Sequence, residues 1–93
     1  MINKEKFKKI VDLAYELEKL GADVFIHYSG HVETIDTRVY LKGWKEGTKP
    51  DYENSCYFDG RLLWGGEENI DDCINSLTEI LNTKKESLDV ERA

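Results

Sequence analysis

Two histidines four residues apart are the first residues in the chain whose types and spacing could do chemistry. His27 and His31 are separated by a tyrosine, Ser29 and Gly30. On one helix, two histidines at this spacing share a side and can bind a metal ion. Ser29 and Gly30 instead predict a turn between them, because these residue types interrupt the alternating pattern of a strand. We therefore expect ordinary turn and strand-end histidines and no metal site.

The other candidates for reactive chemistry are Ser29, Cys56 and Cys73. Neither Ser29 nor Cys56 stands in a sequence signature of an activated nucleophile, and Cys56 should point inward from its strand together with Phe58. Two cysteines this far apart are too few for a zinc cluster or a disulfide framework, so both are interpreted as buried thiols. The phosphate-binding patterns GxxxxGK[ST] and GxGxxG do not occur. We predict a protein that is not an enzyme and needs no cofactor.

Acidic side chains crowd the start of the second helix that the sequence predicts. The formal net charge of the 93 residues is −6, and residues 51–93 hold four basic against eleven acidic side chains. The cluster comprises Glu67, Glu68, Asp71 and Asp72. A helix N-terminus stabilises one or two such carboxylates, by about 0.3 to 1 kcal/mol each, but four together repel one another. We therefore expect this cluster to bind a basic protein surface.

A second candidate surface combines aromatic and charged side chains on one face of the sheet. Asp36, Arg38 and Tyr40 alternate along the longest predicted strand and should point to the face that the helices leave open. Tyr57 and Trp44 join them from neighbouring segments. Aromatic residues mixed with arginine are typical of interface centres. The alternative is cross-strand pairing that only stabilises the sheet.

The elements that must position these residues follow from the hydrophobic periodicity. It predicts a helix over 4–20, strands over 23–28, 34–42, 54–58 and 61–64, and a second helix from about 67 to 83. Asp59-Gly60 predicts the tight turn between the last two strands. The α-β-β-β-β-α order indicates an α+β fold of two layers, a three- to four-stranded antiparallel sheet with both helices on one face. We expect one domain over 1–83 and a charged, frayed tail over 84–93.

The element order and the acidic helix start EENIDDCINSL, residues 67–77, resemble those of the small acidic anti-defence proteins of phages, including anti-CRISPR inhibitors. The resemblance implies a short antiparallel sheet flanked by helices, and carboxylates that imitate DNA phosphates. Double-stranded-RNA-binding domains share the element order, but their second helix begins with a lysine cluster where this chain has acids. That difference argues against RNA binding.

We therefore predict a non-enzymatic protein whose acidic C-terminal half docks on the basic surface of a nucleic-acid-handling enzyme that it inhibits. The alternative is a small structural domain that homo-oligomerises, for example as a homodimer, through its open sheet face. Direct nucleic-acid binding is disfavoured, because phosphate contacts with Lys and Arg supply most of that affinity. The apolar runs are too short to span a bilayer and no signal-type block follows the start, so we expect a cytoplasmic protein without membrane contact.

Overall fold

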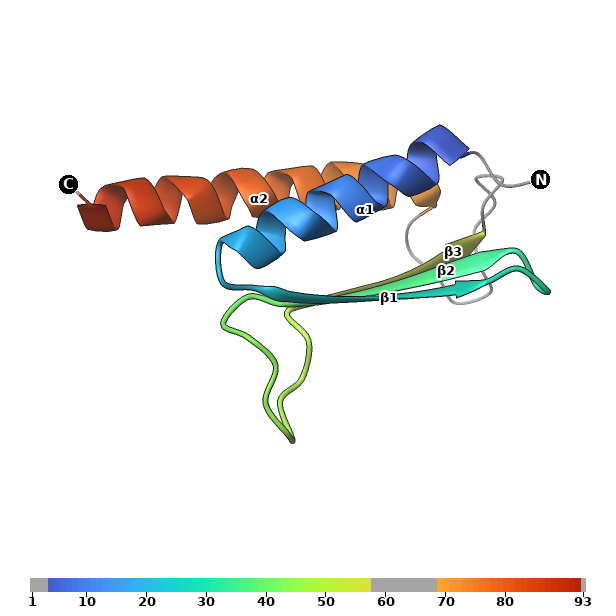
Figure 1. The fold of residues 1–93 in the computed structure, drawn as a ribbon, viewed down its shortest axis with the longest axis horizontal. Helices are drawn as coiled ribbons and strands as arrows, with labels where there is room; N and C mark the ends of the chain where they lie inside the picture. The colour runs from blue at the N-terminus through green and yellow to red at the C-terminus, as the bar shows by residue number, and fades with distance from the viewer. Residues whose placement is uncertain (1–3, 58–68, 93) are drawn as a thin grey trace.

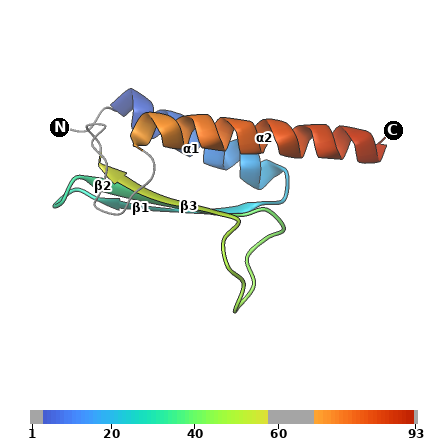
Figure 2. The same cartoon turned by 180° about the vertical axis from the view of Figure 1, so that it is seen from behind.

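The structure, a computed structural model, describes residues 4–57 and 69–92, and the side chains of these residues up to Ser87. Its elements in chain order are α1 (Lys4–Lys19), β1 (Asp23–Ser29), β2 (Thr34–Tyr40), β3 (Tyr52–Tyr57) and α2 (Ile70–Arg92). The strands form one antiparallel sheet in the order β1-β2-β3. Both helices lie on the same side of this sheet, and the loop between β2 and β3 projects from the other side (Figure 1, Figure 2).

The α+β architecture agrees with the sequence, but the predicted α-β-β-β-β-α order is not matched. The described residues have the order α-β-β-β-α. The predicted fourth strand over 61–64 and the Asp59-Gly60 turn lie outside them. β3 begins earlier than predicted, at Tyr52, and α2 continues beyond Thr83 to Arg92, where the sequence predicts a frayed tail.

Tertiary hydrogen bonds are present at both displaced boundaries. The Asp51 backbone N–H donates to the Val39 carbonyl (2.8 Å), while Oδ2 of Asp51 accepts from the Leu41 backbone N–H (2.7 Å). These two bonds close the loop after β2 and bring Tyr52 opposite Val39, where pairing of β3 begins. In α2, Nζ of Lys84 donates to the Leu41 carbonyl (2.8 Å) and so joins the helix to the end of β2 beyond the predicted stop.

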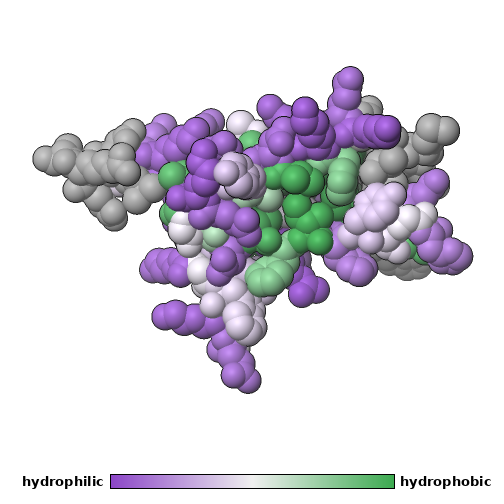
Figure 3. Space-filling view, viewed as in Figure 1, coloured by the Kyte–Doolittle hydropathy of each residue, from purple (hydrophilic) through white to green (hydrophobic). Residues whose placement is uncertain are grey.

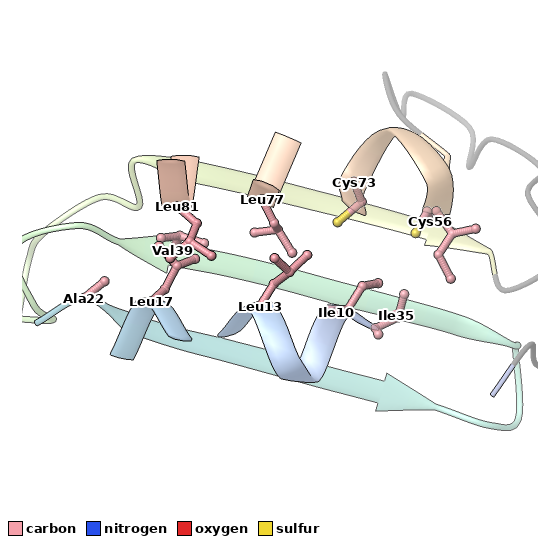
Figure 4. Close-up of a cluster of buried hydrophobic side chains, with 11 residues drawn as sticks. Ile10, Leu13, Leu17, Ala22, Ile35, Val39, Cys56, Cys73, Leu77 and Leu81 are labelled. Atoms are coloured by element: carbon pink, nitrogen blue, oxygen red, sulfur yellow. The ribbon is translucent and has the colours of Figure 1, made fainter. Parts of the chain in front are cut away.

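The hydrophobic core lies between the two helices and the sheet (Figure 4). It is formed by buried side chains at three- and four-residue spacing on both helices and at alternate positions on the strands: Ile10, Leu13, Leu17, Ala22, Ile35, Val39, Cys56, Ile70, Cys73, Leu77 and Leu81. Both cysteines are buried, as predicted. Burying one large aliphatic side chain stabilises the fold by about 1.5 to 3 kcal/mol, so this cluster holds the two layers together.

The helices take separate places above the sheet. α1 packs on β1 and α2 on β3. The rings of Phe7 and Tyr28 meet edge to face with centroids 5.4 Å apart, and an ion pair of 2.9 Å joins Lys6 to Asp71 between the helices.

The chain turns after α1 at Gly21, whose φ of 94° lies in the left-handed region that glycine adopts freely. Of the two helices described, neither has the length and apolar character needed to cross a membrane.

Candidate functional site

The open face of the sheet is the side opposite the helices, and the strand register defines its members. Val24 and Ile26 pack against the core, so Phe25 between them points to the open face. Phe25 pairs with Arg38, and Arg38 pairs with Glu53 on the next strand. These three side chains therefore form a row across all three strands, and Arg38 lies where the sequence predicted it.

Three aromatic residues from three segments gather at one end of this face. The rings of Phe25 and Tyr40 meet edge to face with centroids 5.6 Å apart. Together with Arg38 and Trp44 they line a notch of about 290 Å³. Phe25 is 49% and Trp44 52% exposed, whereas Tyr40 is only 6% exposed. We name this group, Phe25, Arg38, Tyr40 and Trp44, the aromatic corner.

The base of the β2–β3 loop holds Trp44 at the aromatic corner. The Gly43 backbone N–H donates to the Tyr40 carbonyl (3.1 Å), and Gly43 has a φ of 89°, which favours glycine. The Trp44 backbone N–H then donates to Oδ2 of Asp23 at 2.6 Å. Since Asp23 pairs with Tyr40 in the sheet, this bond ties the loop to both strands. The exposed indole is therefore attached to a positioned backbone.

Tyr57 does not belong to the aromatic corner. It pairs with Thr34, six positions along β2 from Tyr40, which corresponds to about 20 Å. The two tyrosines lie on adjacent strands, as predicted, but at opposite ends of the face. The aromatic neighbour of Tyr40 is Phe25, which the sequence prediction of the site left out. In the sequence, the alternation of Phe25 with Val24 and Ile26 indicates that Phe25 points to the open face. Only the strand register shows that Phe25 contacts Tyr40.

The charged groups of the open face are mostly acidic. Nε of Arg38 lies 3.2 Å from Oε2 of Glu53, in a pair whose side chains are both more than half exposed. Such an exposed pair contributes little to stability, so Arg38 can exchange this contact for one with a partner. Asp36 is half-buried opposite His27, and Asp23 lies at the corner. The strands of this face thus have three carboxylates against one guanidinium, and the loop that projects on the same side adds Lys45, Glu46 and Lys49.

The histidines do not form a metal site with the residues that the structure describes. His27 lies in β1 and His31 in the turn that follows it, as predicted. Within the described parts of the chain, no group of three His, Cys, Asp or Glu side chains could hold a metal ion.

Two members of the predicted acidic cluster have structural partners. Asp71 forms the ion pair with Lys6 that joins the helices. The Asp72 backbone N–H donates to Oδ1 of Asn69 (3.0 Å), and Oδ2 of Asp72 accepts from the Asn69 backbone N–H (3.2 Å). This reciprocal pair caps the start of α2, with Asn69 in the place that serine or threonine takes in a capping box. Helix capping therefore accounts for Asp72, whereas the exposed pair of Asp71 with Lys6 contributes little to stability. Glu67 and Glu68 lie outside the described residues.

The aromatic corner is suited to binding a protein surface. Its exposed rings supply apolar contact area, and its arginine supplies directed hydrogen-bond donors. Tryptophan, tyrosine and arginine are enriched at the hot spots of protein interfaces. Comparison of the chain with protein-family models, with curated proteins and with solved structures gives no match.

Proposed function

We propose that the chain is a non-enzymatic binding protein that docks on the basic surface of another protein through the open face of its sheet. The observation that carries this proposal is the aromatic corner. Phe25 and Trp44 each leave about half of a large side chain in water. Their positions follow from the strand register and from the anchored loop, so a partner would meet a preformed surface and little ordering entropy would oppose binding.

The charge of the open face supports a basic partner. Asp23, Asp36 and Glu53 outnumber Arg38, and the whole chain has a formal charge of −6. Complementary charge steers association and selects among partners. Asp71 and Asp72 contribute to the charge of this face only at a distance, because they lie in the first turn of α2 on the other side of the sheet.

Among proteins with basic surfaces, we place nucleic-acid-handling enzymes first. Their Lys and Arg side chains contact phosphates, which supply most of their affinity for nucleic acid. A protein docked there would exclude the nucleic acid and thereby inhibit the enzyme. The small acidic phage anti-defence proteins that the chain resembles act in this general way.

The test is capture of a partner followed by variants of the corner. Immobilised wild-type chain is exposed to lysate of the organism that encodes it, and the captured protein is purified. Its affinity is then measured for wild type and for the double variant Arg38→Ala/Trp44→Ala. We expect at least about 30-fold weaker binding, because loss of an interface Trp or Arg typically costs about 2 kcal/mol or more. Added salt should slow association.

A matched control removes one cation and one apolar side chain elsewhere. Val32 and Lys85 are both exposed, in the β1–β2 turn and on α2. The double variant Val32→Ala/Lys85→Ala should keep wild-type affinity. Equal affinity of the corner variant and wild type, with both folded, would refute docking through this face.

A further inference from the structure

We propose that two copies of the chain pair through β1, joining their sheets into one six-stranded antiparallel sheet with the two α1 helices on the same side. This interface lies at the outer edge of β1, whereas the aromatic corner lies on the open face; Phe25 of β1 belongs to both. The inference does not depend on the proposed function, because it concerns the purified chain alone.

β1 is an edge strand without the usual protection of an edge. Among the described residues its only neighbouring strand is β2. Natural edge strands avoid pairing with other chains by being short, by bulges, or by containing Pro or Lys. β1, with the sequence DVFIHYS, has seven residues that pair with β2 in unbroken register. It lacks Pro, Lys and Arg, and its one acidic residue, Asp23, stands at its first position. Its outer edge is therefore open to a further strand.

The side of α1 above this edge is apolar at its centre. Val11 of α1 is 40% exposed and Tyr28 of β1 is 48% exposed. Val24 and Ile26, which pack on the core, also remain partly exposed. Figure 3 shows hydrophobic side chains gathered between α1 and the sheet, on the side of the molecule where α1 and β1 lie in front. A contiguous exposed patch of this kind marks an interaction surface.

The sequence of β1 is suited to pairing with itself. A symmetric dimer needs a surface complementary to its own copy, related by a two-fold axis. If the axis passes through Ile26, the central residue of β1, Val24 faces Tyr28 of the second copy on the helix side. Phe25 faces His27 of the second copy on the open side. Apolar residues thus meet apolar or aromatic residues, and no like charges are opposed.

The exposed flank of α1 has a charge pattern that is complementary to itself. Its side chains recur at three- and four-residue spacing and are all exposed: Lys4, Lys8, Val11, Tyr15 and Glu18. One end of this flank is basic, the middle is apolar and the other end has Glu18. Beside Glu18, Nζ of Lys19 lies 5.4 Å from the centroid of the Tyr15 ring and pairs with Glu16 at 3.2 Å. Two α1 helices related by the two-fold axis run antiparallel, so Lys4 of one copy lies opposite Glu18 of the other. This complementarity selects a second copy as the occupant.

One axis satisfies both the strand and the helix. Phe7 lies against Tyr28, and α1 runs antiparallel to β1 (Figure 1). Two strand residues from Tyr28 back to Ile26 span about 7 Å. Four helix residues from Phe7 to Val11 span about 6 Å. Val11 therefore lies level with Ile26, and Val11 is also the midpoint of the flank. A foreign extended strand could pair with β1, but it would leave the charge pattern of α1 unused.

The test begins with the mass of the purified chain in solution. Light scattering across a hundredfold concentration range should show a dimer, at twice the 10.8 kDa of the chain, that dissociates on dilution. Lys4→Glu and Glu18→Lys each oppose like charges across the axis and should each weaken the dimer about tenfold. Combining them exchanges the two charges and should restore it.

The restoration is specific to contact between copies. Within one chain, Lys4 and Glu18 are fourteen helix residues apart, about 21 Å, so they cannot pair with each other. The controls Lys9→Glu and Asp12→Lys make the same changes of charge at exposed positions outside the flank and should leave the dimer unchanged. Circular dichroism verifies that each variant is folded.

Three results would overturn the proposal. The first is a monomer at every concentration, which would leave the edge to a foreign strand or to water. The second is a dimer whose affinity falls equally in the flank variants and in the controls, or whose affinity is not restored when the two flank changes are combined. The third is a dimer that Arg38→Ala/Trp44→Ala abolishes, because self-association would then use the open face.

Discussion

Phe25 and Tyr40 meet edge to face with their ring planes at 88°, although neither is the other's direct partner in the sheet. Phe25 pairs with Arg38 and Tyr40 with Asp23, so the two aromatic residues are diagonal neighbours on adjacent strands. Aromatic side chains are long enough to touch across this diagonal. Tyr40 is thereby covered by a side chain that is itself half exposed, and one aromatic pair both stabilises the sheet and presents a surface to a partner.

The Phe25–Tyr40 contact should be measurable as a coupling energy. In a double-mutant cycle, Phe25→Ala and Tyr40→Ala together should destabilise the protein by about 0.5 to 1.5 kcal/mol less than the sum of the two single changes. Urea unfolding followed by circular dichroism measures each free energy. As a control, Phe25→Ala and Tyr57→Ala should add within about 0.5 kcal/mol, because these residues lie far apart. Additive effects in the first cycle would show that the two rings do not stabilise each other.

The cap at the start of α2 should contribute to stability. Asn69→Ala removes the oxygen that accepts from the Asp72 backbone N–H, so the free energy of unfolding should fall by about 1 kcal/mol. For a domain of this size, 1 kcal/mol lowers Tm by about 4 to 8 °C, which thermal unfolding detects. Glu79→Ala, which changes an exposed acid on the same helix, should have little effect. A wild-type Tm for Asn69→Ala would contradict the cap.

The buried hydroxyl group of Thr37 should be replaceable by a methyl group without loss of stability. Thr37 is 1% exposed and lies opposite Asn54 on the helix side of the sheet. Among the residues that the structure describes, Oγ1 of Thr37 and Nδ2 of Asn54 have no hydrogen-bond partner. Thr37→Val keeps the shape and removes a hydroxyl that burial penalises, so the free energy of unfolding should rise by about 1 kcal/mol. Thr48→Val, at an exposed loop position, is the control. A less stable Thr37→Val variant would mean that the hydroxyl is satisfied in solution.

The two cysteines should be structural and not reactive. Both are fully buried between the layers. Cys56→Ala or Cys73→Ala should lower the free energy of unfolding by about 1 kcal/mol through lost packing, without loss of partner binding. A thiol reagent should label them slowly in the native protein and rapidly in urea. Rapid labelling of the native protein would restore the interpretation of a reactive thiol.

The periodicity of the sequence determined the elements and the faces of the described fold. Ile35 and Val39 alternate with Asp36, Arg38 and Tyr40, and this alternation is sufficient to separate a core side from an open side, because successive strand residues point in opposite directions. The helical spacing of apolar residues in α1 likewise indicated its buried side, although Val11, which fits this spacing, is 40% exposed. These are local properties, set by backbone geometry within a few residues, so they can be read without knowledge of the rest of the chain.

Contacts between distant segments decided the rest. In the sequence, Asp71 and Asp72 look like members of one acidic surface. Their partners cannot be recognised there, because Lys6, which pairs with Asp71, is 65 residues away and the cap with Asp72 depends on the orientation of Asn69. The separation of Tyr57 from Tyr40, and the meeting of Tyr40 with Phe25, follow from the strand register. Register depends on how Asp51 closes the β2–β3 loop and on packing across the core, and neither is a property of any single segment. Only the tertiary structure could therefore show which exposed side chains form one surface.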